Sequence, residues 1–153
     1  MAERRTPAEY ASEIRAARDR LVEFAERCSD DDWRARLPGD DPRPVGVIVD
    51  HVADAYGYIG DFVRTVLRGE SLAVDGALID ELNAKHASAY TGVTRMAAIE
   101  HLQRRGDAFI ELISALGDGD LELGDGRVGR LAAIAIRHAD DHRSDVEACL
   151  ADR

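Results

Sequence analysis

The stretch RHADDHR, residues 137–143, places two histidines four positions apart, and its surroundings decide how the chain folds. Apolar residues on both sides of it recur at spacings of three and four, which predicts a long helix over about residues 127–150. Residues i and i+4 lie on one helix face, with Cβ atoms roughly 5–6 Å apart. His138 and His142 could therefore bind one divalent metal ion through ring nitrogens at about 2.0–2.1 Å.

The two histidines continue the apolar series of this helix and do not belong to its charged face. The series consists of Val128, Leu131, Ala135, His138, His142, Val146 and Cys149. Burying an imidazole without a polar partner costs on the order of 1–3 kcal/mol. We therefore expect both rings to bind a metal ion, with hydrogen bonds to neighbouring carboxylates as the alternative.

The rest of the chain predicts helices and no strands. The four long amphipathic segments cover about residues 7–28, 44–69, 94–116 and 127–150, and a shorter helical stretch covers 77–90. Residues 37–44 and 117–126 are expected to be loops, and Trp33 lies in a short capped turn between the first two helices. This order predicts an all-α fold: an antiparallel four-helix bundle, formed by a single domain over residues 1–153, in which the extra helix leads into the third long helix.

A metal site needs a third ligand, and the sequence offers three candidates. His51 is the best, because it borders the apolar series of its helix and reaches the level of the C-terminal pair if the two helices run antiparallel. His86 is the next candidate, since it shares a face with apolar residues of the short helix. His101 is weaker, because it lies to one side of its apolar series among charged neighbours. For each, hydrogen bonding or solvation is the alternative.

Three histidine ligands would leave one position of a tetrahedral site open, as in catalytic or ligand-binding zinc sites. Neutral imidazoles leave such a site cationic, which favours an anionic fourth ligand. Nearby carboxylates could orient the imidazole N–H groups or form a solvated face: Asp50, Asp54, Asp140, Asp141 and Asp145. Asp141 and Asp145 could instead bind the metal directly.

Composition argues against several partners and compartments. The formal net charge of −10 disfavours binding to nucleic acid and to anionic membrane surfaces. No apolar run approaches the ~20 residues needed to span a bilayer, and residues 1–10 lack an apolar signal core, so a cytoplasmic location is expected. Cys28 and Cys149 are expected to be buried free thiols.

Motifs of other metal enzymes are missing from the sequence. The Glu-x-x-His pairs of di-iron carboxylate bundles do not occur on two helices. Between His138 and His142 there is no glutamate that could act as the general base of a His-Glu-x-x-His metalloprotease. Both classes are therefore disfavoured.

Nearly the whole chain resembles the DinB/YfiT-like metalloproteins, which include the mycothiol-dependent maleylpyruvate isomerase group. The resemblance rests on Trp33 before a Pro-rich turn, on RPVGVIVDHVAD at residues 43–54 and on HADDHRSD at residues 138–145. It implies a four-helix bundle, often dimeric, with a divalent metal ion, commonly zinc or nickel. One histidine early in the second long helix and the His-x-x-x-His pair of the last helix hold the metal in this family. The implied ligands are His51, His138 and His142.

The resemblance implies a metal-dependent thiol S-transferase, because some relatives transfer low-molecular-weight thiols such as mycothiol or bacillithiol to electrophiles. The isomerase relatives typically carry a glutamate at the position of His138, so the isomerase reaction itself is not implied. A non-catalytic bundle that binds a metal or a small ligand, of a stress-response type, is the alternative. A metal-free structural dimer is a third hypothesis.

Overall fold

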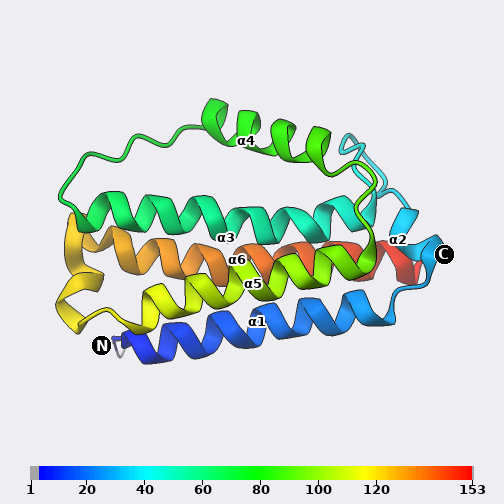
Figure 1. The fold of residues 1–153 in the computed structure, drawn as a ribbon. Coiled ribbons are helices and arrows are strands. Elements are labelled where there is room, and N and C mark those ends of the chain that lie inside the picture. The colour runs from blue at the N-terminus through cyan, green and yellow to red at the C-terminus, as the bar shows by residue number, and fades with distance from the viewer. Residues whose placement is uncertain (1–3, 153) are drawn as a thin grey trace.

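The computed structural model describes residues 4–152, and its regular secondary structure is helical (Figure 1). Its elements are α1 (Pro7–Arg27), α2 (Asp30–Arg34), α3 (Val45–Leu67), α4 (Gly76–Ala89), α5 (Arg95–Ser114), the 3₁₀ helix η1 (Asp118–Glu122) and α6 (Leu123–Ala151). The long helices α1, α3, α5 and α6 form a bundle, and α4 lies outside it against α3. The expected all-α four-helix bundle with an extra helix is confirmed. Residues 1–3 and residue 153 of the expected domain lie outside the described part.

Helix starts follow the capping signals in the sequence. At α1 the Thr6 hydroxyl accepts a hydrogen bond from the Glu9 amide, and the Glu9 carboxylate accepts one from the Thr6 amide. Ser29 and Asp32 form the same reciprocal pair at the start of α2. The turn expected around Trp33 is therefore a short helix.

The loop expected before the last helix contains η1 and then a left-handed turn. The φ angles of residues 124–126 are 62°, 56° and 79°, a region that two glycines and an aspartate can adopt. Regular geometry in α6 therefore starts at Arg127, where the sequence predicts it. Gly124 lies against Val66, so the turn connects to the C-terminal end of α3.

The directions of the helices differ in part from the expected antiparallel order. α3 and α6 are antiparallel, because His51 near the start of α3 approaches His138, whereas Val66 near its end lies against Gly124 at the start of α6. α3 and α5 are parallel, because Asp50 contacts His101 and, further along both helices, Gly60 lies against Phe109. The reason is α4, which carries the chain back along the bundle before α5 begins (Figure 1).

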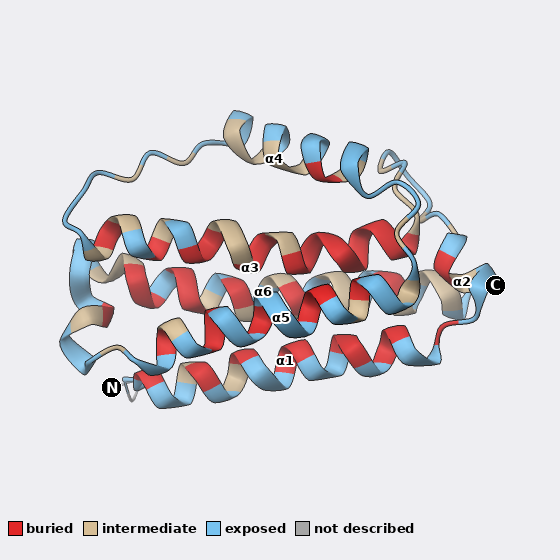
Figure 2. Ribbon diagram, viewed as in Figure 1, coloured by how far each residue is buried: buried red, intermediate tan, exposed pale blue. Residues whose placement is uncertain are grey.

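The first half of α3 is the most enclosed part of the molecule (Figure 2). Every residue from Val45 to Ala53 is buried, including Asp50 and His51. A helix segment that is buried on all sides must provide partners for its polar side chains, because an unpaired polar group in such a place is costly. The side chains of Asp50 and His51 must therefore find polar partners inside the bundle or bind a ligand there.

α4 is attached to the bundle much more loosely. Within this helix His86 is the single buried residue. The segment before it is held by Arg127 of α6, whose Nη1 donates a hydrogen bond to the Leu72 carbonyl at 2.8 Å. α4 and the segment before it therefore form a strap across the outer side of α3 and α6.

The two cysteines have different environments. Cys28 is buried, as expected, and burial raises the pKa of its thiol to about 11. Cys149 is partly exposed, so the expectation of burial is wrong there, because no residue of α6 after Val146 is buried. In the described chain, no helix combines the length and the hydropathy that a membrane span requires.

The contact between α2 and α3 generates a stability prediction. A Cβ atom at Gly46 would collide with the Trp33 indole, which is fixed by its hydrogen bond to the Val93 carbonyl at 2.9 Å. We expect Gly46→Ala to lower the free energy of unfolding by about 1–3 kcal/mol, measured by urea denaturation. Gly76→Ala, where a Cβ meets open space, is the control and should not destabilise the protein. Equal stability of the two variants would contradict this packing.

Candidate metal centre

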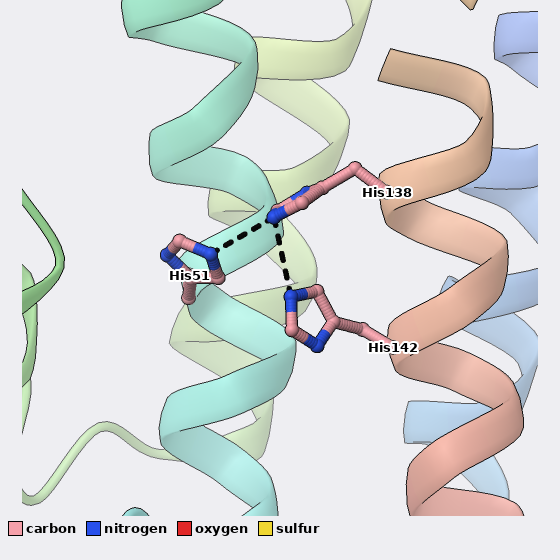
Figure 3. A group of neighbouring side chains, drawn as sticks. All are labelled: His51, His138 and His142. Carbon is pink, nitrogen blue, oxygen red and sulfur yellow. Dashed lines mark hydrogen bonds between the residues drawn. The ribbon is translucent and has the colours of Figure 1, made fainter. Parts of the chain in front are cut away.

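Three histidine side chains from two helices converge on one point (Figure 3). The Nε2 atom of His138 lies 3.0 Å from Nε2 of His51 and 3.2 Å from Nε2 of His142. One ring nitrogen from each histidine lies within 4.8 Å of the others. The structure thus brings together the three predicted residues, and it places His86 and His101 outside this group.

The position of the pair on α6 differs slightly from the prediction. His138 and His142 are half-buried, while Ala139 and Val146 are fully buried. The apolar face is therefore rotated from the expected series, because Ala139 occupies the core position. The two imidazoles lie at the border of the core, where a ligand from outside can reach them.

Hydrogen bonds alone do not explain the cluster. A neutral imidazole nitrogen carries either one hydrogen or one lone pair in the ring plane, so Nε2 of His138 can satisfy only one of its two neighbours. A tetrahedral ion with metal–nitrogen distances of about 2.0–2.1 Å would hold its ligand nitrogens about 3.3–3.4 Å apart. The 3.0 and 3.2 Å separations are close to that value, and the third pair lies within 4.8 Å, so small side-chain shifts would let the three nitrogens bind one divalent cation.

The environment keeps these histidines neutral. Burial, followed by the neighbouring His138 and His142, lowers the pKa of His51 to about 2. Burial, His142 and Arg43 lower the pKa of His138 to about 3, and burial and Arg43 also lower the pKa of His142. Neutral imidazoles have a free lone pair, so near pH 7 protons do not compete with a metal ion for these ligands.

His86 and His101 have a different role from metal binding. The Asp50 carboxylate is fully buried and accepts hydrogen bonds from Nε2 of His86 at 2.7 Å and Nδ1 of His101 at 3.0 Å. Tyr90 stacks on both rings, with centroid distances of 4.7 and 5.5 Å. Burial alone would raise the pKa of Asp50, but the hydrogen bonds from His101 and His86 outweigh it and lower the pKa. His86 and His101 are therefore hydrogen-bonded to a buried carboxylate, which was the expected alternative to metal binding.

The other candidate carboxylates lie outside the histidine group. Asp140 forms an ion pair with Arg20 at 2.9 Å, and it lies two positions from each histidine of the pair, which is about 200° around the helix. Asp141 and Asp145 are exposed, and like Asp54 they are not members of the group that the described residues form. Direct metal binding by Asp141 or Asp145 therefore finds no support.

A cavity of about 500 Å³ opens beside the cluster, between α3, α6 and the strap. Sequence reasoning missed Arg43, which lines it together with the three histidines. Its Nε and Nη2 atoms donate to the Asp41 carboxylate at 2.9 and 2.7 Å, whereas the buried Nη1 has no partner in the described chain. Arg43 begins the motif at residues 43–54, but an arginine in a Pro-rich loop carries no spacing signal, so its place in the site could not be predicted.

These features define a class: a helical bundle in which two antiparallel helices present three neutral histidines to a cavity. A family model described as the DinB superfamily matches residues 13–146, and the chain belongs to that superfamily. The solved structure titled "Sibling Lethal Factor Precursor - DfsB" is similar, with a TM-score of 0.77, 16% sequence identity and 95% coverage of both chains. At that identity the similarity shows the fold alone. Among curated proteins, none matches the chain significantly.

The buried carboxylate generates the second prediction. Asp50→Asn retains the side-chain volume, but its amide group cannot accept hydrogen bonds from both imidazoles. We expect the free energy of unfolding to fall by about 3 kcal/mol at pH 7, measured by urea denaturation of metal-free protein. Asp54→Asn on the same helix is the control, with a change within about 0.5 kcal/mol. Coincident unfolding curves for the two variants would show that the Asp50 hydrogen bonds contribute nothing.

The histidine cluster generates the third prediction. Protein purified without an affinity tag should contain one divalent ion per chain by elemental analysis, and His51→Ala, His138→Ala and His142→Ala should each lose it. Two remaining imidazoles bind too weakly to survive dialysis. His101→Gln should retain the ion, because that side chain contacts Asp50 and not the cluster. Full metal content in any of the three alanine variants would remove that residue from the ligand set.

Proposed function

We propose that the protein is a metal-dependent thiol S-transferase that holds a divalent ion, zinc or nickel, through His51, His138 and His142. The observation that carries the proposal is the convergence of three Nε2 atoms beside a cavity large enough for a small molecule. Three protein ligands leave room for a ligand from the cavity, which is the arrangement of catalytic sites. Membership of the DinB superfamily supports the same assignment.

When bound, the metal ion would lower the pKa of a coordinating thiol and so make its sulfur nucleophilic at neutral pH. The protein's own contribution is to position the reactants and to exclude water with apolar walls. In the transfer reaction the sulfur forms a bond to the electrophilic carbon and the leaving group departs with its electron pair. The proton of the thiol is released to solvent.

Besides Nδ1 of His51, two unpaired polar atoms of residues that line the cavity indicate what a substrate would offer. The Nη1 atom of Arg43 is a buried donor without a partner, and it favours an anionic or carbonyl oxygen near the histidines. The Oδ1 atom of Asn83 on α4 is a buried acceptor without a partner in the described residues. An amide group can satisfy both, because it carries a C=O and an N–H. This favours a low-molecular-weight thiol that contains amide bonds.

A non-catalytic binding bundle is the second candidate, and one observation favours it. Apart from the histidines, Tyr58 and the arginines are the only titratable residues among those that line the cavity in the described structure. Burial, assisted by Asp54, raises the pKa of Tyr58 to about 12, so it is a poor proton donor or acceptor at neutral pH. The cavity therefore supplies no separate general base. Homodimer formation and a cytoplasmic location remain predictions from the resemblance and the composition.

The fourth prediction tests the transferase directly. Protein loaded with zinc or nickel is mixed with monochlorobimane and with bacillithiol, mycothiol, glutathione or coenzyme A, and conjugate fluorescence is followed. We expect turnover with at least one thiol, lost after chelation and in His142→Ala. Arg43→Gln should lower kcat/KM about tenfold, as for the loss of one charge-assisted hydrogen bond. Stoichiometric metal without turnover for any thiol would leave the binding bundle as the function.

A further inference from the structure

The distribution of side chains along the cavity indicates the shape and charge of its ligand. We infer that the cavity binds an elongated anionic thiol, with the sulfur at the three histidines, an apolar body between α3 and α6, and a carboxylate or phosphate at Arg127 and Arg130. The position of the sulfur rests on the proposed function. The anionic end rests on residues at the other end of the cavity.

One face of α6 lines the cavity along much of the helix. The cavity-lining residues Arg127, Leu131, Ile134, His138 and His142 follow one another at spacings of four, three, four and four. They therefore form one stripe along the helix. At a rise of 1.5 Å per residue, Arg130 and Arg127 lie about 12 and 16.5 Å from His138 along the axis. A chain that advances roughly 1.2 Å per bond, as an extended backbone does, would need about 10–14 bonds to connect these ends.

The middle of the cavity is apolar. α3 contributes Ile59 and Phe62, and the strap contributes Val74 and Ile79. Ile134 on the facing side of α6 lines the same cavity and is 39% exposed. Covering this surface with a hydrocarbon-like body is favourable by about 25 cal/mol per Å².

The two arginines at the far end are fixed but not neutralised. Arg127 donates from Nη1 to the Leu72 carbonyl, and Arg130 donates from Nη1 to the Asp125 carbonyl. Neither forms an ion pair with a carboxylate between residues 4 and 152, although the chain has a net charge of −10. Backbone carbonyls thus hold the guanidinium groups while other N–H donors stay free for a carboxylate or phosphate, which arginine binds bidentately.

A matched pair of thiols tests the anionic end. Phosphopantetheine and pantetheine differ in one phosphate, and their binding to zinc-loaded protein is measured by titration calorimetry. We expect phosphopantetheine to bind at least about tenfold more tightly, the gain of one charge-assisted contact. Arg130→Gln should reduce that preference without changing pantetheine affinity. Arg127→Lys, which keeps the charge and a donor for Leu72, should preserve part of it. Arg137→Gln, an exposed position on α6, is the control.

A second series of thiols tests the inferred length of the ligand together with its anionic end. 3-Mercaptopropionate, 6-mercaptohexanoate and 11-mercaptoundecanoate are compared with the corresponding mercaptoalcohols. A carboxylate preference that appears only for the longest chain and disappears in Arg130→Gln would support the inferred length. A preference that is equal at all lengths, or unchanged in Arg130→Gln and Arg127→Lys, would overturn the anionic end.

Failure of the inference and failure of the proposed function give different results. Equal binding of phosphopantetheine and pantetheine to the zinc-loaded protein would overturn the anionic end and leave the metal-bound thiol intact. If neither thiol binds, decanoate is titrated into metal-free protein. If decanoate binds and its affinity falls in Arg130→Gln, the anionic end is supported without the thiol. If decanoate does not bind either, both the anionic end and the proposed thiol site are overturned.

Discussion

The buried carboxylate of Asp50 connects three helices, and the rest of the site depends on it. It lies on α3 and accepts hydrogen bonds from His86 of α4 and His101 of α5. Because successive residues of a helix point about 100° apart, fixing Asp50 toward α4 and α5 turns the next residue, His51, toward α6. The orientation of a candidate metal ligand is therefore set by two hydrogen bonds to the neighbouring residue, about 100° around the helix.

The same hydrogen bonds determine where the cavity lies. His86 is the only buried residue of α4 in the described structure, so its hydrogen bond to Asp50 is the buried contact that attaches this helix to the bundle. By holding α4 there, the carboxylate also places Ile79 and Asn83 over the groove between α3 and α6. A carboxylate suits this role better than an apolar contact, because two directional hydrogen bonds fix position and rotation together.

The parts of this structure that could be predicted from the sequence are those with a local signal. Helix limits follow from capping residues and from the three-and-four spacing, and the pair His138 and His142 follows from helical geometry. His51 required one assumption, an antiparallel α3 and α6, which is correct. The partners of Asp50 lie 36 and 51 positions away and the chain reverses between them, so no periodicity could identify them. The parallel course of α3 and α5 was unpredictable for the same reason.

The net charge of the chain does not indicate the charge of its cavity, because the acidic residues of the described structure lie outside the cavity lining. The chain carries ten more acidic than basic residues, yet the cavity lining contains Arg43, Arg127 and Arg130 and, among the described residues, no carboxylate. Charges interact most strongly where water is scarce, whereas exposed charges more than about 10 Å apart are largely screened at 0.1 M salt. The acidic surface is thus largely screened, whereas the half-buried Arg43 and Arg127 lie on an apolar cavity wall that is less accessible to water. An acidic protein can in this way present a cationic site, and the potential that a ligand meets is set by the few residues of the cavity wall.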